Sequence, residues 1–131
     1  MKSLRIVAIV VIVVILGLAI SLATPAYAQA PTFEKNISLA WTEPRAYARI
    51  VVTSQGWAVK EYRCLAQLWG KESAWNYTAD NPHSTAYGIA QMLGEKSKSP
   101  VTQIQHGIRY IKKRYGNPCA AWKFWQKRYW Y

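Results

Sequence analysis

The sequence predicts a mainly α-helical protein with one small folded domain. Apolar residues recur at spacings of three and four over two long stretches, which is the period of a helix with one buried face. No stretch shows the apolar–polar alternation of a half-buried strand, and no segment repeats. About 100 residues remain once the N-terminal segment is set aside, which is enough for a single modest core.

Residues 1–28 have the features of a secretory signal peptide. A basic start at 1–5 precedes an uninterrupted apolar run at 6–20, and the small-residue pattern A-Y-A occupies 26–28. This order predicts export and cleavage after Ala28. The alternative is an uncleaved membrane anchor, because 6–23 is nearly long enough to span a bilayer. We expect an anchoring contact with a membrane only through this segment, and only if it is not cleaved.

The chain is strongly basic, with 17 Lys and Arg residues, six Asp and Glu residues and a net charge of +11. Signal cleavage would remove two basic residues, Lys2 and Arg5, and leave +9. An exported protein with this charge is expected to meet a cell wall or a membrane surface rather than nucleic acid. We expect a monomer that is secreted or associated with the cell wall and has no nucleic-acid partner.

After the signal segment, residues 29–45 have little hydrophobic periodicity and are predicted to be a linker, so that the folded domain comprises 46–131. The order Thr-Glu-Pro at 42–44 predicts a helix start, because a capping residue is followed by a proline that suits the first turn. This helix is expected to end at Gly56.

The next helix is predicted over 57–73. Its apolar face comprises Ala58, Tyr62, Leu65, Leu68 and Trp69. Three positions further, the same face reaches Glu72, a carboxylate among aromatic residues. Glu61 also lies near this face, but at the helix start we expect its side chain to reach water. Because a buried carboxylate is costly unless it is paired or neutral, Glu72 is the unusual residue of this helix.

Residues 76–100 are rich in Asn, Asp, Gly, Ser and Pro and are predicted to be mostly loop, with a helical turn or short strand at 86–93. Apolar residues at three- and four-residue spacings then predict a helix over 101–115, which the Gly-Asn-Pro sequence at 116–118 ends. A last helix is expected from Cys119.

The two cysteines, Cys64 and Cys119, have one possible pairing. In an exported domain we expect them to form a disulfide, which would close a loop of about 55 residues and contribute a few kcal/mol. Two buried free thiols are the alternative. The two histidines, His83 and His106, have no second ligand at helical spacing, so that no metal site and no cofactor are predicted.

Glu72 has two interpretations from the sequence alone. Between aromatic surfaces its pKa would rise, and it would then be suited to act as a general acid, for instance on the departing oxygen of a glycosidic bond. Aromatic walls would also suit the apolar faces of sugar rings, and the chain has seven Trp and nine Tyr residues. The alternative is a structural glutamate at a helix end that pairs with Lys71 or another cation.

Three blocks of the sequence follow one another in a specific order. They are CLAQLWGKESAWN at 64–76, NPHSTAYGIAQM at 81–92 and TQIQHGIRYIKKRYGNPCAAW at 102–122. Together they resemble the small secreted lytic transglycosylases of the lysozyme-like superfamily, over about 46–131. The resemblance implies a lysozyme-like single domain with a cleft, one disulfide and peptidoglycan as the substrate.

The resemblance also implies roles for individual residues. Glu72 would be the catalytic acid and base of the family's Glu-Ser motif, and Ser73 would follow it in the site. Gly88 and Gln91 match the family's Gly-x-x-Gln segment, in which the glycine lets the backbone approach the sugar and the glutamine lines the cleft. Tyr110 matches a tyrosine that points toward the active centre.

Two aromatic residues are further substrate-binding candidates. Trp75 and Tyr87 are expected to be either cleft walls or core residues, with the core slightly favoured for both. The pair Cys64 and Cys119 matches a cysteine pair of close relatives, in agreement with the disulfide expected from the cysteine count.

In the family, one glutamate protonates the glycosidic oxygen between N-acetylmuramic acid and N-acetylglucosamine, and the muramic C6 hydroxyl attacks to give a 1,6-anhydro product. The alternative within enzymes is a hydrolytic lysozyme, in which Asp80 or Glu95 would hold a water opposite Glu72. Two alternatives from other classes are a cationic wall-binding protein without activity and a cationic membrane-active protein.

Overall fold

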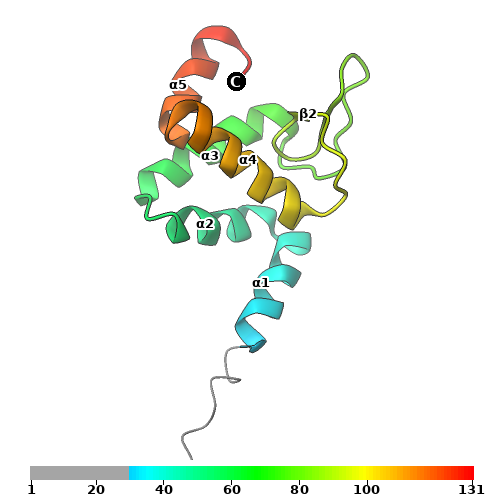
Figure 1. Ribbon diagram of the computed structural model, residues 1–131, viewed down its shortest axis with the longest axis vertical. Coiled ribbons are helices and arrows are strands. Elements are labelled where there is room, and N and C mark those ends of the chain that lie inside the picture. Colours follow the sequence, from blue (N-terminus) through cyan, green and yellow to red (C-terminus); the bar gives the residue numbers. More distant parts are fainter. Residues whose placement is uncertain (1–29) are drawn as a thin grey trace, which may run out of the picture.

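The computed structural model describes residues 30–131. This part of the chain is mainly helical, as predicted, with five α-helices and one small antiparallel hairpin (Figure 1). The elements are α1 (Ala30–Thr42), α2 (Pro44–Ser54), α3 (Val59–Ser73), β1 (Ala86–Tyr87), β2 (Met92–Leu93), α4 (Pro100–Tyr115) and α5 (Pro118–Arg128). The predicted signal peptide at 1–28 lies outside the described residues. None of the helices within 30–131 is long and apolar enough to cross a membrane.

Three of these helices open on a proline. Pro44, Pro100 and Pro118 each occupy the first turn, where proline's lack of an N–H costs no hydrogen bond. At α5 the preceding Asn117 also caps the helix, because its side-chain oxygen accepts a hydrogen bond of 2.9 Å from the N–H of Ala120. Of these prolines, only Pro44 was predicted as a helix start, whereas Pro118 was predicted to end the preceding helix and also opens α5.

The linker predicted over 29–45 is wrong for most of its length, because this stretch forms helix α1. Ala40 is fully buried and Leu39 packs against the core, where α1 contacts α2 and α4. Two of its large apolar residues point the other way, since Phe33 is 66% exposed and Trp41 is 47% exposed. The apolar residues thus do not fall on one face, and the periodicity that identifies the other helices is weak here.

The core is centred on α3. Leu65, Leu68 and Trp69 of this helix are fully buried. Gly107 of α4 lies close to Trp69, because an added Cβ would lie 2.5 Å from the Trp69 ring and 2.7 Å from the Ala90 methyl carbon. A larger side chain at Gly107 would therefore push α4 away from Trp69 and from the hairpin.

Helix α5 is fixed to α3, beside which it lies in Figure 1. The predicted disulfide is present and joins Cys64 to Cys119 across the two helices. Glu61 supports the same junction, because its Oε2 accepts a hydrogen bond of 2.9 Å from the N–H of Cys119. The expectation that Glu61 reaches water is wrong: the residue is 7% exposed, and its carboxylate satisfies the positive end of α5.

Candidate active site

Glu72 lies in the last turn of α3, which ends at Ser73. Its side chain is half-buried, and its Oε1 accepts a hydrogen bond of 2.6 Å from the indole N–H of Trp125 on α5. No cation of residues 30–131 lies within ion-pair distance of this carboxyl group, so that the pairing with Lys71 considered from the sequence is not formed. Glu72 is a half-buried acid with a single neutral donor on one of its oxygens.

The environment of Glu72 favours its neutral form. Burial raises the pKa of Glu72 above its ordinary value of 4.5, and the hydrogen bond from Trp125 opposes that rise. The carboxyl group therefore keeps its proton to a higher pH than an exposed glutamate does. An acid of this kind can give a proton to a leaving group and take one back, which is the requirement of general acid–base catalysis.

Aromatic side chains from three parts of the chain gather beside Glu72. The indole N–H of Trp69 donates to the hydroxyl of Tyr131 at 2.8 Å, and that hydroxyl donates to the carbonyl of Ala90 at 2.8 Å. Burial raises the pKa of Tyr131 well above its ordinary range, and the charge of Glu72 adds to the rise. Tyr131 thus stays neutral and ties the end of the chain to α3 and to the hairpin.

Ser73, the second residue of the Glu-Ser motif, makes a structural contact. Its hydroxyl donates a hydrogen bond of 2.7 Å to the carbonyl of Ile89, in the turn between β1 and β2. This contact joins the last turn of α3, which carries Glu72, to the hairpin. Ser73 therefore holds the backbone of the hairpin turn close to Glu72.

The two residues of the Gly-x-x-Gln segment shape the hairpin turn. Gly88 has a φ of +76°, and an added Cβ would lie 2.3 Å from the side chain of Gln103. Gln91 has a φ of +47°, and its side-chain N–H groups donate to the carbonyls of Ala79 at 3.2 Å and of Gly88 at 3.0 Å. Glycine is thus required at 88 by both the left-handed backbone and the close approach of Gln103.

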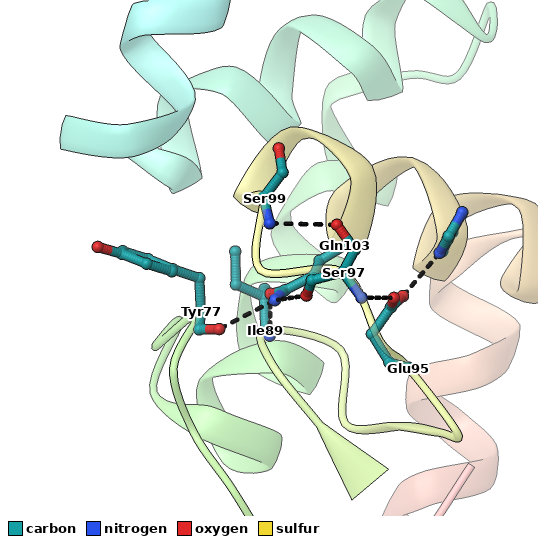
Figure 2. A network of polar contacts seen from close by, with 7 residues as sticks. Tyr77, Ile89, Glu95, Ser97, Ser99 and Gln103 are labelled. Carbon is teal, nitrogen blue, oxygen red and sulfur yellow. Dashed lines mark hydrogen bonds and ion pairs between the residues drawn. The ribbon is translucent and has the colours of Figure 1, made fainter.

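Gln103, which was not predicted from the sequence, organises this region. The side chain is buried, and its Oε1 accepts from the N–H of Ile89 at 3.0 Å, while its Nε2 donates to the carbonyls of Tyr77 at 2.9 Å and Ser97 at 2.8 Å (Figure 2). One amide on α4 therefore holds three separate loop segments. The available signal was a polar residue beside Ile104 on the buried face of the helix, three positions after the proline that opens it.

Tyr110 of α4 lies at the edge of the aromatic cluster. Its ring meets that of Tyr131 edge-on, with centroids 5.7 Å apart, and its hydroxyl accepts a hydrogen bond of 2.6 Å from Arg114. The half-buried tyrosine thus contacts Tyr131, the residue that ties α3 to the hairpin.

Trp75 and Tyr87 have different environments. Trp75 is 4% exposed, its indole N–H donates to the carbonyl of Ala66 at 3.2 Å, and it meets Trp69 edge-on at 5.3 Å. Its expected role as a cleft wall is not supported by this burial, and the core alternative is the one that the structure contains. Tyr87 is half-buried, with the Lys98 ammonium 3.7 Å from its ring centroid.

The carboxylates that a hydrolytic mechanism would need are elsewhere engaged or exposed. Glu95 accepts hydrogen bonds from the N–H of Ser97 at 2.7 Å and bonds His106 Nδ1 at 2.6 Å (Figure 2). Burial alone would raise the pKa of Glu95, but these bonds and the attraction to His106 bring it below the ordinary value. Asp80 is exposed. His106 is thus hydrogen-bonded to Glu95, and residues 30–131 contain no cluster of potential metal ligands.

Comparisons of the chain with protein-family models, with curated proteins and with solved structures found no match. The site is therefore interpreted from the motifs and from the geometry around Glu72.

Proposed function

We propose that the protein is a lytic transglycosylase that acts on peptidoglycan, with Glu72 as its single catalytic acid and base. The observation that carries the proposal is the state of Glu72 among residues 30–131: a half-buried carboxyl group with a raised pKa, one neutral hydrogen-bond donor and no cation of this part of the chain to neutralise it. A structural glutamate is usually paired, whereas an acid kept neutral by burial is suited to proton transfer.

The proposed reaction needs one group that first gives a proton and then takes one. Glu72 protonates the oxygen between N-acetylmuramic acid and N-acetylglucosamine, and the bond from that oxygen to the muramic C1 breaks with assistance from the N-acetyl group. The muramic C6 hydroxyl then bonds to C1 and returns its proton to Glu72. The products are an N-acetylglucosamine end with a free hydroxyl and a 1,6-anhydro muramic end, and no water is consumed.

The other carboxylates support a mechanism with one glutamate. Glycosidases that use water or a covalent intermediate need a second carboxylate across the scissile bond. Glu61 is committed to the start of α5, and Glu95 is committed to Ser97 and His106. The disulfide and the positive net charge agree with an exported monomer that meets an anionic cell wall.

The deciding experiment incubates the exported, oxidised protein with insoluble peptidoglycan, beside a Glu72→Gln variant, and analyses the soluble products by mass spectrometry. We expect 1,6-anhydro-muropeptides from the unmodified protein and none from Glu72→Gln. Products with reducing ends would instead indicate a lysozyme and a second carboxylate. Tight binding that falls steeply with salt, without release by either protein, would indicate a wall-binding protein.

A further inference from the structure

The hydrogen bond between Trp125 and Glu72 connects α5 to α3, and these two helices are also joined at a second place. α5 is tied to α3 near its start by the Cys64–Cys119 disulfide and by the bond from Cys119 to Glu61. Near its other end, Trp125 reaches the last turn of α3 and donates to Oε1 of Glu72 at 2.6 Å. The donor is therefore carried by a helix whose position is fixed independently of Glu72.

The Trp125 ring is itself held in place on both sides. It stacks on Trp122, with centroids 5.2 Å apart and an interplanar angle of 16°, and it meets Tyr129 edge-on at 5.6 Å. Side-chain rotation of Trp125 would break both contacts. The indole N–H thus points at one oxygen of Glu72 from a rigid support.

We propose that Trp125 is the positioning residue of Glu72. Its N–H donates a hydrogen bond to Oε1, so that Oε2 is the oxygen that carries the acidic proton and delivers it to the glycosidic bond. This inference rests on the proposed function. An indole N–H donates and cannot accept, so that the oxygen it bonds must present a lone pair. The carbonyl oxygen of a neutral carboxyl group is a better acceptor than its hydroxyl oxygen, so that the bond from Trp125 to Oε1 favours the proton on Oε2 and sets its direction.

The hydrogen bond from Trp125 also affects the pKa of Glu72. A donor on Oε1 stabilises the carboxylate, and burial stabilises the neutral acid, so that the two effects act in opposite directions on the pKa of Glu72. Removal of the indole N–H leaves burial unopposed. The titration of Glu72 should then move to higher pH, and the side chain should lose its fixed orientation.

The test measures titration and activity in the exported, oxidised protein and two variants. Trp125→Phe removes the N–H and keeps an aromatic ring, and Trp41→Phe is the matched control, because Trp41 is a 47% exposed tryptophan of α1 without a hydrogen bond to Glu72. Circular dichroism checks that each variant is folded. NMR follows the carboxyl carbon of Glu72 against pH, and peptidoglycan digestion gives the rate of anhydro-product release against pH.

We expect the Glu72 titration of Trp125→Phe to shift upward and that of Trp41→Phe to stay in place. The release rate of Trp125→Phe should fall at least about tenfold, and the alkaline limb of its pH profile should move with the titration. An unchanged Glu72 titration and pH profile in Trp125→Phe would overturn the inference.

A measurement on the unmodified sequence keeps the inference testable if Trp125→Phe does not fold. The indole N–H resonance of Trp125 should shift with the titration of Glu72, and the shift should disappear in Glu72→Gln. A Trp125 resonance that does not respond to pH would overturn the inference. If the resonance and the titration behave as expected but no protein releases product, the proposed function fails while the Trp125–Glu72 coupling stands, so that the two failures are distinguishable.

Discussion

Replacement of Gln103 by leucine should destabilise the fold strongly, although the two side chains have similar size. The substitution removes three hydrogen bonds, of 2.8 to 3.0 Å, to Ile89, Tyr77 and Ser97. A hydrogen bond of this kind contributes about 1 kcal/mol, and a buried donor left without a partner costs about 1–3 kcal/mol. Because Ile89 is fully buried, its N–H has no access to water, and we expect a total loss of about 3–5 kcal/mol.

The assay is urea unfolding followed by circular dichroism, together with thermal unfolding. A loss of about 3 kcal/mol corresponds to a fall in Tm of at least about 12 °C for a domain of this size. Gln105→Leu is the matched control, because Gln105 lies on the same helix, is exposed and makes one long contact of 3.4 Å to Tyr47. Its effect should stay within about 0.5 kcal/mol. A loss below about 1 kcal/mol for Gln103→Leu, or one equal to that of the control, would refute the reasoning.

Three further predictions concern stability. Replacement of both Cys64 and Cys119 by alanine should lower the free energy of unfolding by about 4 kcal/mol in urea titrations, since the bridge closes a loop with a sequence separation of 55. Gly107→Ala should cost about 1–3 kcal/mol, because its Cβ would lie within 2.7 Å of two neighbouring side chains; unchanged unfolding would contradict the close packing. Opposite pH dependences are expected at the two acids. The folded-state pKa of Glu72 is raised, so that the stabilisation of the fold by its neutral form is lost as pH rises above 4.5. The free energy of unfolding of Glu72→Gln should therefore increase relative to that of the unmodified protein as pH rises. The folded-state pKa of Glu95 is lowered, so that its stabilisation is present above 4.5 and is lost on acidification through the folded-state pKa, and Glu95→Gln should remove this loss from the pH series.

Local signals were sufficient to predict four helices and the disulfide. The stripe that includes Leu65 and Trp69 identified α3, and Pro44 marked the start of α2 because the effect of proline on the backbone is local. Cys64 and Cys119 had only one possible partner each. These features depend on residues within one or two turns, or on a count, and need no knowledge of the tertiary structure.

The remainder depended on contacts between distant segments. Glu61 was misplaced because its partner, the N–H of Cys119, lies 58 positions away in the sequence. Gln103 was missed because its three hydrogen-bond partners lie in separate loop segments, and no periodicity in the sequence connects these segments to it. At the candidate site, Glu72 was identified by its unusual position on an apolar face, but its partner Trp125 is 53 positions away and carries no signal as one aromatic residue among many.

The motif residues around Glu72 differ in how many of their hydrogen-bonding groups are already used within the fold. The hydroxyl proton of Ser73 is committed to Ile89, and both amide hydrogens of Gln91 point to backbone carbonyls. Ser73 fixes the hairpin turn against the end of α3, and Gln91 fixes this turn to Ala79. Under the proposed function, substitution of either residue should alter the rate mainly by displacing Glu72. Within residues 30–131, the Glu72 carboxyl has a partner on Oε1 alone. The proposed proton transfer therefore falls to the motif residue whose second oxygen has no partner in the described fold.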